Sequence, residues 1–533
     1  MADENIKKMI LEGNAVLGIE LGSTRIKAVL INSSNEPIAQ GGSDWENALI
    51  DGYWTYSLQD VWKGVATCMK NLKHDVQQKY GVALTKTKAL GISAMMHGYL
   101  AFDKKGNLLV PFRTWRNTTT HKASEKLSEL FDYPVPERWS VSHLYQAILN
   151  NEEHVKDIAY VGTLAAYVHW TLSGNKVLGV GDVSGMFPID TTTHDYNEKM
   201  LKQFDTLIEQ KGYEWNLRSI FPKVLISGQE AGSLTPQGAL LLDPSGAFAS
   251  GIPMCPPEGD AGTGMVATNS IAQRTGNVSA GTSVFAMIVL ERELSKSYHK
   301  LIDLVTTPDG SLVAMSHANN CTGEYDRWLA LFGQVIEATG NTIKKHELYD
   351  TLLATALNGA KDCGGLLPFN YISGETMTGI YEGRPLFIRL TENEFTIENF
   401  MRAQLFTALG ALRVGMDILF EEEQVKIDAI NGHGGFFKTP VVGQTMMAAA
   451  MHTPISVLKT AGEGGAWGIA LLASYLVHSE GATLQDFLSH KVFGSSEAST
   501  VCATQEDIDG FNAFFINYKK GLAVERAAVE NLP

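Results

Sequence analysis

Two distant segments of this chain share one pattern: an apolar strand, a small polar turn and a second apolar strand. The first covers residues 16–31 with the turn Gly22-Ser23-Thr24, and the second covers residues 277–290 with the turn Gly281-Thr282-Ser283. Their apolar and β-branched flanks predict buried strands. The repeat predicts two similar domains, each carrying one such turn. The alternative is two ordinary hairpins that match by chance.

The chemistry of these turns favours an anionic ligand. Glycine allows a close backbone approach, and turn amides and hydroxyls can bind an anionic oxygen. Glu20 ends the first strand, where it could face a cation that accompanies the anion. Each turn alone is equally compatible with a simple chain reversal.

Length and charge narrow the classes of protein. A chain of 533 residues is too long for one core, so we expect two domains, residues 1–265 and 266–533. The net charge of -15 argues against a nucleic-acid-binding surface. It does not argue against ATP, because a phosphate site is local.

Cysteine usage and hydropathy point to a cytoplasmic protein. The five cysteines are scattered without a CxxC pair, as expected for reduced thiols, and no zinc site is visible. The N-terminus has no signal-peptide core, and no apolar run approaches the roughly 20 residues that span a bilayer.

Several segments have clear periodicity. Residues 60–80 predict a helix, residues 89–98 a strand that ends in Met96-His97-Gly98, residues 99–110 a strand pair, and residues 161–172 a helix. His97 at a strand end is where α/β folds bind ligands. The alternative, which a lone histidine favours, is a hydrogen bond to a loop carbonyl.

Polar loops follow these elements. Trp115 could stack on a sugar face while Arg116 and Asn117 bind its hydroxyls, or the loop could simply bury a tryptophan at the surface. Asp182 lies between glycines and is by itself most simply a turn residue. Asp260 opens a small-residue helix over residues 261–268, either as an N-cap or as a general base with room for a bulky substrate.

A second glycine-rich region suits a nucleotide. Residues 427–451 predict a strand, a turn with Gly434 and Gly435, and a helix, so backbone amides can meet phosphate and a base can lie on bare glycine. The alternative is a plain glycine turn. The chain has neither a P-loop nor an N-terminal Rossmann fingerprint.

Taken in order, these motifs resemble the FGGY family of carbohydrate kinases over nearly the whole chain. Two phosphate motifs lie at residues 20–27 and 281–283, and a sugar-side Met-His-Gly lies at residues 96–98. An Asp-x-Ser-Gly segment lies at residues 182–185, and a Gly-Asp with small residues lies at residues 259–261. A Leu-Pro to Ser-Gly-Glu segment lies at residues 367–375, and an adenosine motif lies at residues 434–435.

Two positions depart from the family pattern. Glu20 stands where the family has aspartate, so water-mediated contact with Mg²⁺ becomes more plausible than direct contact. The family's Trp-x-Asp-x-Arg is Trp115-Arg116-Asn117-Thr118-Thr119 here, so a carboxylate becomes an amide and the arginine is missing.

The resemblance implies an α/β protein of two ribonuclease-H-like domains, as in actin, hexokinase and Hsp70, facing a central cleft that closes over its substrates. It implies ATP and Mg²⁺ as cofactors and a ketopentose, xylulose or ribulose, as acceptor. The implied catalytic base is Asp260, and Glu20 would serve the metal. The implied sugar contacts are Met96, His97, Gly98, Trp115, Asp182 and Asp260. The implied ATP contacts are Gly22, Ser23, Thr24, Lys27, Gly281, Thr282, Ser283, Gly434, Gly435 and Gln444.

Other functions stay open at this point. The departures at Glu20 and Asn117 motivate a non-catalytic sugar- or nucleotide-binding regulator of the same fold, and the acceptor could instead be water, glycerol or gluconate. Glu324 could bind a sugar hydroxyl or cap a helix. Expected partners are the small-molecule sugar and ATP, with a homodimer as the assembly to test and with no nucleic acid or membrane.

Overall fold

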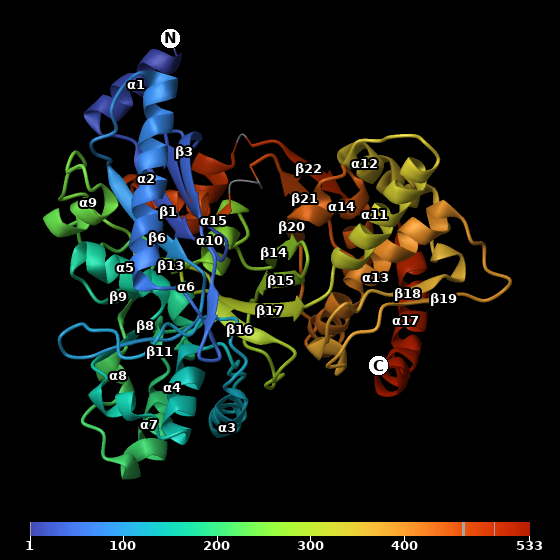
Figure 1. Ribbon diagram of the computed structural model, residues 1–533, viewed down its shortest axis with the longest axis horizontal. Helices are drawn as coiled ribbons and strands as arrows, with labels where there is room; N and C mark the ends of the chain where they lie inside the picture. Colours follow the sequence, from blue (N-terminus) through green and yellow to red (C-terminus); the bar gives the residue numbers. More distant parts are fainter. Residues whose placement is uncertain (1, 461–463, 495, 533) are drawn as a thin grey trace. The chain divides into compact units, whose positions relative to one another are not determined.

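A computed structural model describes residues 2–460, 464–494 and 496–532 of the chain. It divides into two compact units (Figure 1). Unit 1 comprises residues 1–271, 304–313 and 463–495, and unit 2 comprises residues 272–303, 314–462 and 496–533. Two later segments thus return to unit 1. The division into functional domains at residues 265 and 266 stays a prediction. The small residues of segment 461–468 also predict the start of a helix, and residues 461–463 of that segment lie outside the described residues.

Unit 1 is built on a five-stranded sheet in the order β13-β6-β1-β2-β3. The first predicted hairpin is confirmed, since β1 and β2 pair antiparallel, and β6 and β13 add in parallel on the other side of β1. The strands are β1 (Val16–Leu21), β2 (Arg25–Ile31), β3 (Pro37–Asp44), β6 (Ala89–Ala94) and β13 (Glu258–Gly259).

Two helices cover opposite faces of this sheet. Helix α2 (Leu58–Tyr80) packs on β2 and β3, and α15 (Gly464–His478) packs on β1, β2 and β6. A Cβ at Gly41 would meet α2, whereas a Cβ at Gly18 would lie 2.2 Å from the Ala466 carbonyl of α15. Glycine is needed at Gly18 because the helix backbone comes so close. The predicted helix over residues 60–80 is confirmed, and its apolar stripe is buried.

The remaining elements of unit 1 are short. Its other helices are α1 (Ala2–Glu12), α3 (His121–Phe131), α4 (Ser140–Leu149), α5 (Leu164–Ser173), α6 (Val180–Val183), α7 (Glu198–Ile208), α8 (Leu217–Ile220), α9 (Pro236–Leu242), α10 (Asp260–Ala267) and α16 (Leu484–Asp486). Its other strands are β4 (Ala48–Ile50), β5 (Tyr53–Thr55), β7 (Leu100–Phe102), β8 (Tyr160–Gly162), β9 (Val177–Gly179), β10 (Ile189–Asp190), β11 (Asp195–Tyr196) and β12 (Lys223–Leu225).

Two local predictions hold only in part. Residues 99–110 pair around the predicted turn through one antiparallel bridge, Phe102 to Leu108, and a 2.9 Å bond from the Leu109 N–H to the Ala101 carbonyl, but residues 108–110 form no strand, and β7 pairs along its length with the distant β8. The helix predicted from Val161 begins at Leu164, since Tyr160–Gly162 belong to β8. In both cases a partner far along the chain determined the structure.

Unit 2 repeats the strand arrangement of unit 1. Its sheet runs β17-β15-β14-β20-β21-β22, with β14 and β15 antiparallel and β14, β20 and β21 parallel. The order β17-β15-β14-β20-β21 therefore corresponds to β3-β2-β1-β6-β13. The strands are β14 (Thr275–Ala280), β15 (Val284–Val289), β17 (Leu312–Ala318), β20 (Ala429–His433), β21 (Ile455–Leu458) and β22 (Ala498–Val501). The hypothesis of a duplicated strand–turn–strand is confirmed.

One helix of unit 2 corrects the sequence analysis. Helix α13 (Ile397–Asp417) and the turn after it form a 26-residue helix, Ile397–Glu422, that is long and apolar enough to cross a membrane. The absence of such a run was wrongly predicted. Because 83% of its most apolar window is buried inside the structure, it is the core helix of unit 2. Around it lie α11 (Gly323–Ala338), α12 (Lys345–Thr355), α14 (Val442–Met451) and α17 (Gln505–Asn531). Strand β16 (Asp303–Thr306) lies next to β17 at the edge of the sheet, and β18 (Leu367–Phe369) and β19 (Leu386–Ile388) pair with each other in a separate two-stranded sheet.

Candidate functional site

The predicted residues of unit 1 meet at one edge of its sheet. Strands β1, β6 and β13 are parallel, so the segments that follow them lie at the same edge. These segments are the first turn (Gly22-Ser23-Thr24), the Met96-His97-Gly98 loop and the start of α10 at Asp260. The Met95 N–H donates to the Leu21 carbonyl at 2.9 Å and ties the first two together.

Asp260 is the half-buried first residue of α10. Its Oδ1 accepts the Met96 N–H at 3.0 Å, so the carboxyl is held against the loop after β6. Burial raises the pKa of this carboxyl, and hydrogen bonds from the Met96 and Ala261 N–H groups oppose the rise. A carboxylate with a raised pKa is a stronger base, which suits proton acceptance from a hydroxyl.

Glu20 reaches a segment that sequence reasoning did not connect with it. Its Oε2 accepts the Ala466 N–H at 3.1 Å in the first turn of α15. A Cβ at Gly465 would lie 2.2 Å from Glu20 Oε1, so this glycine makes room for the longer glutamate. Burial and the charge of Asp260 raise the pKa of Glu20 to about 7, against smaller opposing effects that include the charge of Lys27 opposite it on β2.

Asp182 lies in a buried carboxyl cluster. The Thr163 hydroxyl donates to its Oδ2 at 2.6 Å, while Oδ1 is buried without a hydrogen-bond partner. Glu258, which the sequence analysis missed, accepts the Gly181 and Asp182 N–H groups at 3.3 and 2.9 Å. Burial raises the pKa of Asp182 to about 7 and that of Glu258 well above its usual value. Because Asp182 is fully buried, it is better placed to hold its loop than to touch a sugar.

The surroundings of Glu258 explain two glycines. A Cβ at Gly179 or Gly181 would lie 2.1 or 2.5 Å from a Glu258 carboxyl oxygen. The segment Leu178-Gly-Val-Gly-Asp182 therefore forms the space for a carboxyl group from β13. An acidic residue two positions before Asp260, directly after the apolar run of residues 252–257, is the sequence signal that would have revealed it.

His97 has the environment of the simpler alternative. It is buried with a φ of 72°, and its Nδ1 lies 3.1 Å from the Gly185 carbonyl. Arg138, which the sequence analysis did not single out, donates from Nε to His97 Nε2 at 3.0 Å. Nε2 is therefore an acceptor and Nδ1–H the donor to Gly185. Burial, with the Arg138 charge, holds the pKa of His97 well below its usual value, so the ring is neutral.

In the loop after β7, Trp115 is accessible to a ligand, whereas the amide of Asn117 is not. Trp115 is 41% exposed, and its Nε1–H donates to Ser23 Oγ at 3.3 Å. Asn117 is buried, accepts the Trp54 N–H at 2.8 Å and donates to the Trp54 and Thr114 carbonyls. Arg116 stacks on the Trp54 ring at 3.8 Å. Asn117 stands where the family pattern has aspartate, and its amide holds the loop together. It is therefore not free to bind a sugar.

The turns of both units leave small polar groups at the surface. Thr24, Thr282, Gly434 and Gly435 are exposed, and Ser23, Lys27, Gly281 and Ser283 are half-buried. In unit 2, Gly434 has a φ of 102°, and a Cβ there would lie 2.3 Å from the Ala280 carbonyl that precedes the second turn. The Gly434 segment and the second turn are therefore packed together at the end of β14 and β20.

Gln444 makes structural hydrogen bonds within unit 2. Its Nε2 donates to the Ile455 carbonyl at 3.0 Å and to the Ser499 carbonyl at 2.7 Å. Its Oε1 accepts the Ser499 hydroxyl at 3.2 Å. Both amide hydrogens are used in fixing α14 to β21 and β22, so neither is free to bind ATP. The contact between Gln444 and ATP stays a prediction.

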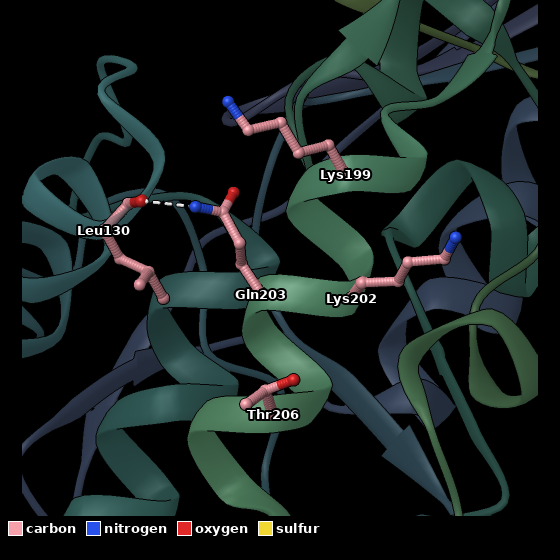
Figure 2. Close-up of a pocket in the computed structure, with 5 residues that line it drawn as sticks. All are labelled: Leu130, Lys199, Lys202, Gln203 and Thr206. Atoms are coloured by element: carbon pink, nitrogen blue, oxygen red, sulfur yellow. Dashed lines mark hydrogen bonds between the residues drawn. The ribbon is translucent and has the colours of Figure 1, made fainter.

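A surface hollow elsewhere contains none of the predicted site residues. It measures about 580 Å³ and is lined by Leu130, Lys199, Lys202, Gln203 and Thr206 of α3 and α7 (Figure 2). Gln203 Nε2 donates to the Leu130 carbonyl at 2.8 Å, and Figure 2 shows the Lys202 side chain extending away from this bond. The hollow is open and its lysines are solvated.

The carboxyls of unit 1 fit a water-mediated magnesium site. Within residues 2–460, 464–494 and 496–532, no group of three or more His, Cys, Asp or Glu is arranged to hold a metal by itself. Mg²⁺ instead uses one or two carboxylates together with waters and phosphates. Glu20 and Asp260 are close enough for Asp260 to raise the pKa of Glu20, and a cation near both would relieve that repulsion.

Family comparison covers most of the chain. The N-terminal domain model of the FGGY family of carbohydrate kinases matches residues 15–261, and its C-terminal domain model matches residues 276–477. A relative named xylulose kinase from Haemophilus influenzae is 22% identical over 478 residues, which is 86% of this chain and 90% of that protein.

Solved structures agree with the fold. The crystal structure of xylulose kinase from Rhodospirillum rubrum has a TM-score of 0.77 at 15% identity and covers 97% of this chain and 100% of its own. The crystal structure of gluconate kinase from Lactobacillus acidophilus also has a TM-score of 0.77, at 14% identity, and covers 97% of this chain and 99% of its own. At these identities the likeness establishes the two-domain α/β fold.

Proposed function

Because the chain belongs to the FGGY family of carbohydrate kinases, we propose that it transfers the γ-phosphoryl group of ATP to a hydroxyl of a ketopentose, xylulose or ribulose, in pentose catabolism. The name of the Haemophilus influenzae relative supports this acceptor class. The location proposed for this activity is the cytoplasm.

The half-buried carboxyl of Asp260, held by the Met96 N–H, carries the mechanistic proposal. Asp260 accepts the proton of the attacking sugar hydroxyl, whose oxygen forms a bond to the γ-phosphorus as the bond to the β,γ-bridging oxygen breaks. The products are the sugar phosphate and ADP. The raised pKa of Asp260 supports its role as the base.

The other site residues have supporting roles in the proposal. The exposed ring of Trp115 offers a stacking face to the sugar, and the Met96-His97-Gly98 loop shapes the pocket. Asp182 and the neutral His97 hold their loops. In unit 2, the second turn donates to phosphate, and Gly434 and Gly435 support the adenosine. Bound Mg²⁺ would offset the negative charge of the phosphates, with Glu20 holding it through water.

The alternative of a non-catalytic regulator loses one of the two observations that supported it. It rested on the departures at Glu20 and Asn117, and the amide of Asn117 is explained by its bonds to Trp54 and Thr114. An acceptor other than a ketopentose keeps support from the likeness to the gluconate kinase fold. A substrate panel separates these possibilities.

The test is ADP release with ATP and Mg²⁺ against D-xylulose, L-xylulose, D-ribulose, L-ribulose, glycerol and gluconate. We expect one ketopentose to exceed the glycerol and gluconate values of kcat/KM by roughly ten-fold or more, about 1.4 kcal/mol of transition-state binding. A highest value for glycerol or gluconate would change the substrate class. A flat panel at the background rate would favour the regulator.

A further inference from the structure

Three aromatic side chains donate hydrogen bonds to the first turn. Trp45 Nε1–H donates to the Gly22 carbonyl at 2.7 Å, and the Tyr56 hydroxyl donates to the Ser23 carbonyl at 2.5 Å. Trp115 Nε1–H donates to the Ser23 hydroxyl oxygen at 3.3 Å. These donors come from three separate segments of unit 1 and converge on two consecutive residues.

The two carbonyl bonds determine where the turn's amides point. A peptide group is planar and trans, so a carbonyl and the next residue's N–H point in opposite directions. The described chain has no cis peptide bond. Holding the Gly22 carbonyl therefore orients the Ser23 N–H, and holding the Ser23 carbonyl orients the Thr24 N–H.

These two N–H groups are available to a ligand. Among the hydrogen bonds of the described residues, none is donated by the N–H of Ser23 or Thr24, whereas the Gly22 N–H donates to the Arg25 carbonyl at 3.0 Å. Ser23 is half-buried and Thr24 is exposed. Adjacent N–H groups on one turn form a site that suits an anionic oxygen.

The aromatic donors are themselves held firmly. Trp45 and Tyr56 are 8% and 3% exposed, and their rings stack with centroids 4.2 Å apart. The Trp45 backbone N–H also donates to the Thr24 carbonyl at 3.1 Å. Packed aromatic rings with few rotatable bonds place a donor at low entropic cost.

We propose that Trp45 and Tyr56 are positioning residues for phosphoryl transfer: by holding the Gly22 and Ser23 carbonyls they direct the Ser23 and Thr24 N–H groups toward a phosphate of ATP. Trp115 fixes the Ser23 hydroxyl, whose own hydrogen is left to donate. This inference rests on the proposed function of the same site, because it assigns the first turn to the phosphates.

The test begins with Tyr56→Phe, which removes only the hydroxyl and keeps the stacked ring. With the best sugar of the panel, we expect kcat to fall about ten-fold while the KM for the sugar stays within about two-fold. Tyr196→Phe is the matched control, because its buried hydroxyl also donates to a backbone carbonyl, that of Pro222, at 2.9 Å. A role in stability alone would lower the melting temperature of both variants and leave both kcat values near wild type.

Trp45→Phe tests the second carbonyl independently. It removes the indole N–H and keeps an aromatic ring on Tyr56, so kcat should fall by a similar factor. Since both residues orient one turn, the double variant should lose less than the product of the single losses. Unchanged kcat in both single variants would overturn the proposal.

A binding measurement keeps the test valid if no sugar is phosphorylated. Calorimetry with a non-hydrolysable ATP analogue and with adenosine compares Tyr56→Phe with wild type. We expect weaker binding of the analogue, by about three-fold or more, and equal binding of adenosine. Equal binding of both would reject the assignment of the turn to phosphate, whereas an inert sugar panel with the expected binding difference would reject only the ketopentose acceptor.

Discussion

At the scale of single residues, the carboxyl of Asp260 is the group whose removal should affect chemistry most directly. Asp260→Asn keeps the shape and an oxygen for the Met96 N–H, but it cannot accept a proton. We expect kcat for sugar-dependent ADP release to fall by about 10²–10⁴. Asp44→Asn, at a side chain that is 89% exposed, is the control. A rate for Asp260→Asn near that of wild type would disprove the assignment of the general base.

Gln444 gives a second residue-scale prediction, because its structural and ATP-binding roles have different consequences. Gln444→Leu leaves the carbonyl of buried Ile455 without its donor and removes the bond to the carbonyl of exposed Ser499, so the free energy of unfolding should fall by about 1–3 kcal/mol. The KM for ATP should stay within about two-fold. A large rise in that KM with little loss of stability would instead support a contact with the nucleotide.

The sequence identified positions better than roles at this scale. The motifs led to His97, but the donor that fixes its ring, Arg138, lies far along the chain and leaves no local signal. The orphaned Oδ1 of Asp182 and the glycine-lined space around Glu258 depend on close packing, which residue type and spacing do not encode. What could be predicted was which residues lie at strand ends, because that follows from hydrophobic patterning.

At the scale of elements, α15 depends on one glycine, Gly468, for its close approach to α10. A Cβ at Gly468 would lie 2.0 Å from the Thr263 carbonyl, which is backbone and cannot move aside cheaply. We expect Gly468→Ala to lower the free energy of unfolding by about 1–3 kcal/mol, measured by urea denaturation. Gly333→Ala is the control: it lies in α11, and its Cβ would meet only the end of the Leu348 side chain at 3.3 Å.

The control variant, Gly333→Ala, should not lower the free energy of unfolding. Alanine is favoured over glycine in a helix by about 1 kcal/mol, so Gly333→Ala should be neutral or stabilising. Equal losses in both variants would mean that the α10–α15 contact does not determine the effect.

Elements were predictable wherever their determinants are local. The stripe of α2 and the two hairpins follow from periodicity, and the structure confirms them. The partner of β7 and the return of α15 to unit 1 depend on pairing and packing across long sequence separations. The strand pair predicted over residues 99–110 is only partly formed for this reason.

At the scale of the whole molecule, unit 1 keeps several carboxyl groups out of water, and this links its stability to pH. Burial, with the charge of Asp260, raises the pKa values of Glu20 and Asp182 to about 7, from ordinary values of 4.5 and 3.8. Burial also raises the pKa of Glu258 and of Asp260 itself. Between its ordinary and its raised pKa, each of these carboxyls binds more protons in the folded protein than in the unfolded chain.

Between pH 5.5 and pH 8, the stability contributed by each of these carboxyls should therefore fall as pH rises toward about 7, whereas buried histidines with lowered pKa values, such as His97, contribute in the opposite direction. Asp182→Asn removes one titrating group while its amide oxygen can still accept the Thr163 hydroxyl. Urea denaturation at both pH values should show that this variant loses less stability than wild type, by on the order of 1–3 kcal/mol. Asp44→Asn changes an exposed side chain that is not part of the buried carboxyl cluster, so its loss of stability between the two pH values should equal that of wild type. Parallel curves for Asp182→Asn and wild type would mean that Asp182 is already ionised in the folded protein and that the pH dependence arises from the other carboxyls.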